Sequence, residues 1–114
     1  MKDDCIFCKI AAGTAPATIL HADDDVVAFR DVNPQAPTHV LLIPRRHVAR
    51  LSELAPGESS VIAKIVDVAN AVAREQGLAD GFRIVVNNGR RAGETVPHLH
   101  AHLLGGRALR WPPG

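Results

Sequence analysis

The sequence has almost no net charge, because its 114 residues carry 13 basic and 12 acidic side chains and the formal net charge is +1. A protein that binds duplex nucleic acid through its phosphates needs a broad basic surface, which this composition excludes. The chain also lacks any run of the ~20 apolar residues that a membrane-spanning helix requires. Charged residues occupy positions 2–4, where a secretion signal needs apolar ones. We therefore expect a soluble cytoplasmic protein.

Cysteine is scarce, with only Cys5 and Cys8. Such a short loop gains little from a disulfide, and a reducing cytosol keeps thiols reduced, so a disulfide scaffold is excluded. The Cys-x-x-Cys spacing is half of a zinc site, which His39, His47 or the histidines near the C-terminus could complete. The alternative is a pair of buried structural thiols. A redox role is disfavoured because no βαβ pattern accompanies the motif.

Internal repeats and low-complexity segments are also absent, and 46% hydrophobic content predicts one domain, residues 1–114, that can close a core. Apolar periodicity predicts two helices, over 5–12 and 57–77, and five strands, over 19–21, 26–30, 40–43, 82–86 and 97–104. The first three strands suggest an antiparallel meander. Pro56 suits the first turn of the long helix and Gly77 its left-handed end. The predicted fold is α+β, a five-stranded antiparallel sheet covered on one face.

The most informative stretch is 97–104, where His98, His100 and His102 alternate with aliphatic residues. Alternation in a strand places the three imidazoles on one face and the aliphatic residues on the core face. Rings about 6.7 Å apart disfavour each other's protonation, so we expect neutral imidazoles near pH 7. Neutral ring nitrogens act as nucleophiles, proton acceptors or metal ligands. Three merely solvated histidines are disfavoured because strands prefer β-branched and aromatic residues.

A catalytic zinc centre built from all three histidines is a rival interpretation. In a regular strand the three positions span about 13 Å, whereas each ligand nitrogen must lie about 2.0–2.1 Å from one ion. Two of them could share a metal, but three could not without a sharp distortion of the strand.

Two loops flank the histidines. The first begins at Asp31 and ends at His39, and an Asp before Asn-Pro most often forms a turn. The second contains Gly89 and Gly93, which allow close approach of the backbone, and its N–H groups can form an anion nest. Such loops usually serve only the turn. Because this one leads into the histidines, an anion held there would lie beside the imidazoles.

Together these motifs resemble the histidine triad (HIT) superfamily. The stretch His98-Leu99-His100-Ala101-His102-Leu103-Leu104 is similar to its His-φ-His-φ-His-φ-φ signature, and the segments 31–39, 103–107 and 111–114 look like its Hint branch, the histidine triad nucleotide-binding proteins. The resemblance covers nearly the whole chain. It implies a homodimer that binds purine nucleotides and hydrolyses nucleoside 5′-phosphoramidates, such as AMP joined through nitrogen to an amine. The alternatives are a dinucleoside polyphosphate hydrolase and a non-catalytic nucleotide sensor or interaction protein.

The resemblance also implies roles for individual residues. His100 would attack the α-phosphorus to form a covalent nucleotidyl intermediate, and His102 would bind phosphate oxygens or assist the leaving group. His39 would join the same proton network, and His98 completes the triad. Spacing does not tell which imidazole protonates the leaving amine. Asp31 would bind the ribose hydroxyls, and the rest of the nucleotide would be enclosed by Ile6, Phe7, Ile10, Phe29, Val32, Asn87, Gly93, Thr95 and Val96.

The resemblance extends to a metal and a partner. Many bacterial members have cysteines like Cys5 and Cys8 that bind zinc with histidines placed like His47 and His98, which implies a structural Zn²⁺. The breadth of the long helix's apolar stripe and the stiff apolar segment 111–113 are consistent with a homodimer, and the alternative is a tail folded on its own domain.

The sequence departs from the commonest Hint pattern at three positions: Thr95 stands where a serine is usual, Pro97 immediately precedes the triad, and Glu94 is an additional acid. Glu94 lies in the loop that would hold the phosphate. A carboxylate there repels an anion unless it points outward or meets a cation, and we expect that cation to be a lysine-like leaving group.

Overall fold

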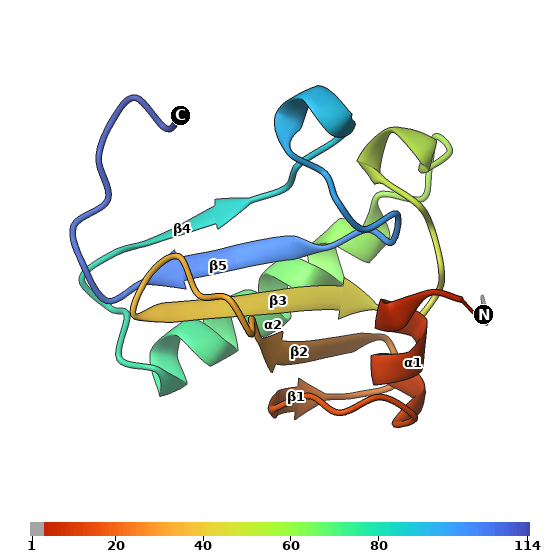
Figure 1. Ribbon diagram of the computed structural model, residues 1–114, viewed down its shortest axis with the longest axis horizontal. Coiled ribbons are helices and arrows are strands. Elements are labelled where there is room, and N and C mark those ends of the chain that lie inside the picture. The colour runs from red at the N-terminus through yellow and green to blue at the C-terminus, as the bar shows by residue number, and fades with distance from the viewer. Residues whose placement is uncertain (1–3) are drawn as a thin grey trace.

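The structure, a computed structural model, describes residues 4–114 (Figure 1). Within them lie the helices α1 (Ile6–Ala12) and α2 (Ser60–Glu75), the short 3-10 helices η1 (Leu51–Glu53) and η2 (Arg90–Ala92), and the strands β1 (Ile19–Ala22), β2 (Val26–Arg30), β3 (Thr38–Pro44), β4 (Phe82–Val85) and β5 (Ala101–Gly105). Lys2 and Asp3, part of the charged start that argues against a secretion signal, lie outside the described residues. In the described part of the chain, no helix combines the length and apolarity needed to cross a membrane.

The five strands form one antiparallel sheet in the order β1-β2-β3-β5-β4. The predicted α+β fold and the meander of β1, β2 and β3 are confirmed. Helix α2 connects β3 to β4 and lies behind the sheet in the view of Figure 1, while α1 lies where β3 ends. This end of the sheet is where the chain approaches β5 with His98 and His100.

The face of the sheet opposite α2 is also covered in part, over β2 and β3, which corrects the prediction of a single covered face. Residues 26–29 and 40–43 are all buried, and their alternation divides them between two apolar clusters. One cluster packs under α2 and includes Val26, Ala28, Val40 and Leu42. The other packs with α1 and includes Val27, Phe29, Leu41 and Ile43. Unbroken apolar runs are typical of strands buried on two faces, whereas one-sided strands alternate with polar residues.

Helix α2 begins later than predicted. It starts at Ser60, and Pro56 lies in the preceding turn, where the Glu58 carboxylate accepts the Ala55 N–H at 2.7 Å. The predicted left-handed end is confirmed, because Gly77 has φ +73°. The Leu78 N–H donates to the Ala73 carbonyl at 2.9 Å, which satisfies a carbonyl that the end of the helix would otherwise leave free.

Strand β5 also begins later than predicted, at Ala101 rather than 97. Its pairing with β3 starts at Leu42 opposite Ala101, and residues 43 and 44 pair only with β2. The preceding segment is instead held by Leu99, whose N–H donates to the Val48 carbonyl at 2.7 Å. Only the third histidine of the signature therefore belongs to regular strand.

Candidate active site and metal centre

The three histidines of the signature lie in one row beside α1. The His100 and His102 rings are 5.0 Å apart between centroids, and Phe7 of α1 packs edge-on against His100 at 5.1 Å and His98 at 6.0 Å. The intervening residues are buried, namely Leu99, Ala101 and Leu103. Alternation thus separates polar from core residues as predicted, even though the first two histidines precede the strand.

His100 has its ring proton placed by a backbone carbonyl. Its Nδ1 lies 2.7 Å from the carbonyl oxygen of His98, and a carbonyl can only accept. In the neutral ring, Nδ1 therefore donates and carries the proton, which leaves the lone pair on Nε2. His100 is 7% exposed and lines a cavity. In this tautomer its Nε2 can act as a nucleophile or as a base.

His102 has the opposite arrangement, which is set through His39. The Gln35 N–H donates to His39 Nδ1 at 3.0 Å, so the His39 proton lies on Nε2. This Nε2–H donates to His102 Nδ1 at 2.9 Å, which places the His102 proton on its own Nε2. That nitrogen is buried and has no hydrogen-bond partner among residues 4–114. An unsatisfied buried donor of this kind is costly unless an acceptor, such as a ligand oxygen, meets it.

Burial favours the neutral form of His39, His98 and His102. It lowers the pKa of His39 and His98, and together with the neighbouring His100 and His39 it lowers the pKa of His102 to about 4. The predicted neutral state is therefore supported for His98 and His102 of the triad. The larger cause is desolvation rather than the expected repulsion between imidazolium charges.

A cavity of about 440 Å³ opens in front of His100 and His102. Its other lining residues are mostly apolar and come from α1, from the segment before β1, from β2 and β3, and from the segment before β5: Ile6, Phe7, Ile10, Pro16, Ala17, Phe29, Arg30, Asp31, Val32, Leu41, Thr95 and Val96. An apolar cavity with a few convergent polar groups is the usual form of a small-molecule site.

Asp31 serves both the turn and the cavity. Its Oδ1 accepts the Asn33 N–H at 2.8 Å, which forms the expected Asx turn. Its Oδ2 lies 3.4 Å from His39 Nε2, and its side chain is 19% exposed where it lines the cavity. One oxygen of the Asp31 carboxylate is thus close both to the cavity and to the hydrogen-bonded pair His39–His102, called the histidine relay below.

Four thiol and imidazole groups form a second cluster next to the first. Cys5 Sγ lies 3.3 Å from His98 Nδ1, and Cys8 Sγ lies 3.5 Å from His98 Nδ1 and 3.3 Å from His47 Nδ1. His98 donates its Nε2–H to the Pro44 carbonyl at 2.8 Å, so its Nδ1 lone pair faces the thiols. All four ligand atoms lie within 4.8 Å of one another.

These distances fit a tetrahedral zinc ion. Bonds of about 2.3 Å to sulfur and 2.0–2.1 Å to nitrogen place ligand sulfur and nitrogen atoms about 3.5 Å apart, close to the separations found. Burial raises the pKa of the Cys5 thiol, while the Cys8 N–H, 3.3 Å from Cys5 Sγ, opposes that rise. A bound cation would supply the remaining stabilisation of the thiolates. His98 thereby faces the cluster and not the cavity, which argues against one centre made of all three triad histidines.

A third group of ligand atoms, from Asp31, His39 and His102, is also close enough for a metal. The Gln35 N–H argues against one, because it keeps the His39 proton on Nε2, the atom that a metal would need. The hydrogen bonds favour a proton relay at this position.

The sequence of this chain also matches known proteins. The sequence model of the HIT domain matches residues 12–109. The chain belongs to the HIT domain family. This HIT protein is 48% identical over 114 residues, all of both chains, to an uncharacterised HIT-like protein of Synechocystis sp.. It is 46% identical over 112 residues, 96% of this chain and 87% of the relative, to a 14 kDa zinc-binding protein of Zea mays.

Solved structures show the same HIT fold. A HIT family hydrolase from Legionella pneumophila is 46% identical with a TM-score of 0.94, covering 97% of this chain and all of that one. A histidine triad nucleotide-binding protein from Candida albicans is 31% identical with a TM-score of 0.82, covering 96% and 83%. A Zn-bound histidine triad family protein from Mycobacterium smegmatis is 33% identical with a TM-score of 0.78, covering 91% and 76%.

Most of the predicted nucleotide residues of the HIT protein line the cavity, but two do not. Asn87 and Gly93 lie together in the adjacent loop, where a Cβ built on Gly93 would be 3.8 Å from Asn87 Nδ2. Sequence reasoning missed four lining residues, Pro16, Ala17, Arg30 and Leu41. For Leu41, the signal was present in the fully apolar run 40–43, which places every second residue on the α1 face.

Glu94 is the clearest departure from expectation. Its carboxylate meets Arg50 of the HIT protein itself, at 3.0 Å from Nε and 3.0 Å from Nη2, and its side chain is only 9% exposed. Arg50 thus balances this charge within the chain, and the preference for a lysine-like leaving group stays a prediction. Arg50 was not recognised from the sequence.

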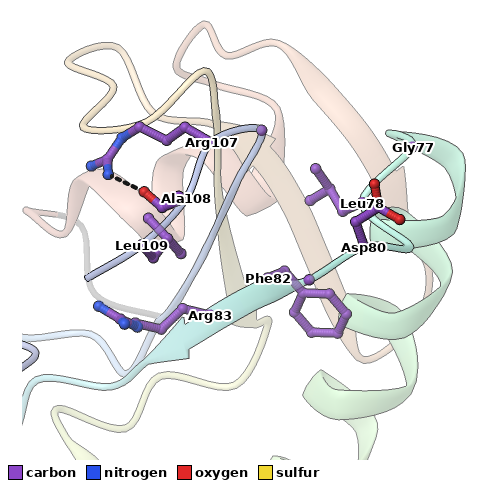
Figure 2. Close-up of a pocket in the computed structure, with 10 residues that line it drawn as sticks. Gly77, Leu78, Asp80, Phe82, Arg83, Arg107, Ala108 and Leu109 are labelled. Carbon is purple, nitrogen blue, oxygen red and sulfur yellow. Dashed lines mark hydrogen bonds between the residues drawn. The ribbon is translucent and has the colours of Figure 1, made fainter. Parts of the chain in front are cut away.

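A larger cavity of about 620 Å³, shown close up in Figure 2, lies beside the start of β4 and the end of β5, at the end of the sheet away from α1 (Figure 1). It is bordered by the end of α2, by β4 and by the segment after β5, and Figure 2 shows Phe82, Arg83 and Arg107 around it. The two arginines are engaged by backbone carbonyls: Arg107 donates to Ala108 and Gln35, and Arg83 donates to Arg110. Histidine and cysteine are missing from its lining. The smaller cavity beside the histidines is therefore the better candidate for chemistry.

Proposed function

We propose that this HIT protein is a Hint-type nucleotidyl hydrolase that cleaves purine nucleoside 5′-phosphoramidates through a covalent nucleotidyl-His100 intermediate. The observation that carries the proposal is the pairing of two neighbouring ring nitrogens at one cavity. His100 Nε2 offers a lone pair, and His102 Nε2 offers an unpartnered N–H. A nucleophile beside a hydrogen-bond donor suits displacement at phosphorus, because the donor stabilises the negative charge on the phosphate oxygens.

The cavity suits the nucleotide part of such a substrate. Ile6, Phe7, Ile10, Phe29 and Val32 would enclose the purine, since apolar walls bury a flat base well. The Asp31 carboxylate would accept hydrogen bonds from the ribose hydroxyls. Thr95, Val96 and the loop that contains Asn87 and Gly93 would hold the phosphate next to His100. The nucleotide-binding relative from Candida albicans supports a nucleotide ligand.

In the first step, the His100 Nε2 lone pair attacks the α-phosphorus and the bond from phosphorus to the amine nitrogen breaks. The leaving amine takes its proton from water that reaches the cavity. His102 keeps its Nε2–H, which donates a hydrogen bond to a phosphate oxygen, and the His39 Nε2–H holds His102 in this tautomer. The His98 carbonyl, which accepts the His100 Nδ1–H, stabilises the positive charge that develops on the nucleophilic ring.

In the second step, water attacks the phosphorus and the bond to His100 Nε2 breaks. The water proton passes to solvent, which balances the proton taken up by the amine in the first step, and the nucleoside monophosphate leaves. The overall change consumes one water and releases one amine.

We propose that Cys5, Cys8, His47 and His98 hold a structural Zn²⁺. The Zea mays and Mycobacterium smegmatis relatives, described as zinc-binding and Zn-bound, support this assignment. When bound, the ion would keep both thiols ionised and tie α1 to the segment before β5. The ion would thereby fix the position of Phe7, which forms part of the apolar wall, and of the His98 carbonyl, which orients His100.

We also propose that the protein acts as a cytoplasmic homodimer of one HIT domain, residues 1–114. Apolar side chains are exposed on α2, on the edge strand β4 and in the tail, with Val66 and Phe82 each 40%, Ile84 37% and Trp111 81% exposed. Surface apolar groups concentrated on neighbouring elements are typical of subunit interfaces.

The deciding experiment is a rapid denaturing quench during turnover of an AMP phosphoramidate, followed by intact-protein mass spectrometry. Wild type is expected to carry one AMP adduct, and His100→Ala none. His21→Ala, a change at an exposed histidine of β1, serves as the control and should retain the adduct. An adduct on His100→Ala would remove that residue from the nucleophilic role. Tight AMP binding without turnover would identify a nucleotide sensor instead.

A further inference from the structure

An ion pair outside the histidine relay connects the two loops that border the site. The Arg50 guanidinium donates from Nε to both oxygens of Glu94, at 3.0 and 3.3 Å, and from Nη2 to Oε2 at 3.0 Å. Arg50 follows the metal-ligand candidate His47 by three residues, and Glu94 immediately precedes Thr95 of the cavity wall. The pair therefore ties the loop after β3 to the loop before β5.

Glu94 also closes its own loop. Its Oε1 accepts the Gly89 N–H at 2.9 Å, and its own N–H donates to the Gly89 carbonyl at 3.2 Å. The two loops are linked a second time by the Ser52 N–H, which donates to the Asn88 side chain at 2.8 Å. The conformation of the loop that borders the phosphate position thus depends on a carboxylate.

That carboxylate poses an electrostatic problem for an anionic ligand. Glu94 immediately precedes Thr95, and Thr95 lines the same cavity as His100. The Glu94 carboxylate is therefore close to the position of a phosphate that His100 would attack. Unpaired, Glu94 would repel the nucleotide, because two like charges in a partly desolvated site interact strongly.

We propose that Arg50 is a positioning residue for the nucleotide phosphate, which holds the Glu94 carboxylate in the loop and neutralises its charge. The inference rests on the proposed function, since it concerns the same phosphate. Arg50 also pairs with Glu53, whose side chain is 52% exposed against 9% for Glu94, so water screens the charge of Glu53 while the guanidinium offsets that of Glu94. Glu94 can therefore hold the loop through its hydrogen bonds without repelling the phosphate.

The proposed role and a purely structural role of the ion pair predict different results for the single and the double variant. If Arg50 serves to neutralise Glu94, removing Arg50 alone must be worse than removing both charges. If the pair only holds the loop together, Glu94→Gln must itself be harmful and cannot rescue a change at Arg50. Gln keeps the oxygen that accepts the Gly89 N–H, so it removes the charge with little change in shape.

The test compares the binding of AMP with that of adenosine, which fills the same cavity without a phosphate. We expect Arg50→Gln to weaken AMP about tenfold, the size of effect expected for one unpaired charge near a partly desolvated anion, and to leave adenosine within about twofold. Adding Glu94→Gln should restore AMP affinity to within about twofold. Arg50→Lys, which keeps the charge, should lose about threefold or less. High salt should shrink the effect of Arg50→Gln.

Arg46→Gln is the matched control, because Arg46 pairs with Glu58 on the surface at 2.7 Å and lies outside the cavity. It should leave both affinities unchanged. The proposal is overturned if the double variant binds AMP as weakly as Arg50→Gln, or if AMP and adenosine weaken in parallel. Wild-type protein that binds neither ligand would overturn the proposed function itself, whereas normal wild-type binding with the wrong variant pattern would overturn only the role of Arg50.

Discussion

Stability should fall with acidification because of His102. Its pKa is about 4 in the folded chain, below the ordinary 6.5, because burial and the neighbouring imidazoles disfavour its charged form. Between pH 6.5 and 4 the unfolded chain binds a proton that the folded chain does not. The free energy of unfolding therefore decreases as the pH falls through this window and no longer changes from this cause above pH 6.5.

The size of this effect follows from the two pKa values. Between pH 7 and pH 5, a group titrating at about 6.5 unfolded and about 4 folded removes about 1.8 kcal/mol from the free energy of unfolding. His102 is only half-buried, and solvent screening reduces such a figure, so we expect about 1 kcal/mol. Other buried histidines add to the total slope, and so does any loss of metal at low pH. A variant that removes only the titration of His102 is therefore needed.

His102→Gln is suitable, because its amide oxygen can accept the His39 Nε2–H and does not titrate. The free energy of unfolding of wild type and variant is measured by urea unfolding at pH 7 and pH 5, at fixed zinc concentration. The change between the two pH values in the wild type is then compared with the change in the variant. The wild type should lose about 1 kcal/mol more than the variant on acidification. An equal loss in both proteins would show that His102 takes up its proton in the folded state as readily as in the unfolded one, and would refute the reasoning.

Three further predictions concern the relay, the metal and the sheet end. His39→Gln should lower kcat about 10²-fold in steady-state kinetics and leave AMP affinity within about twofold, and a loss confined to affinity would contradict the relay. Cys8→Ser should abolish the binding of about one zinc per chain measured by elemental analysis, and its urea midpoint should match that of chelated wild type; full zinc content would contradict the site. Gly105→Ala should cost about 1–3 kcal/mol of stability, since an added Cβ would lie 2.9 Å from both Leu78 methyl groups, and the cost should nearly vanish in Leu78→Ala.

Much of the fold could be predicted because the period of the apolar residues reflects which side chains are buried. The strand over 26–30 matches β2, and the helix end at Gly77 follows from the backbone freedom of glycine. The starts of α2 and β5 could not be predicted from the same signal. They depend on where a neighbouring strand ceases to offer hydrogen bonds, as β5 shows at Ala101, and such pairing is a property of the assembled sheet.

The candidate site was likewise predictable from the sequence only in part. Alternation identified which face carries the histidines, but the positions of their protons depend on the Pro44 and His98 carbonyls and on the Gln35 N–H. No side-chain pattern encodes those backbone groups. Arg50 was missed for a related reason, since a lone arginine in a loop has no periodicity and its partner is 44 residues away.

The main-chain origin of the group that orients His100 has a consequence for how the site tolerates change. The side chain of residue 98 serves the thiol cluster, while its carbonyl oxygen holds the nucleophilic ring. Every amino acid brings that oxygen, so the two duties of this position are chemically separable. A descendant of this chain can exchange its metal ligand for another residue and retain the same tautomer at its reactive nitrogen, provided the local backbone path is preserved.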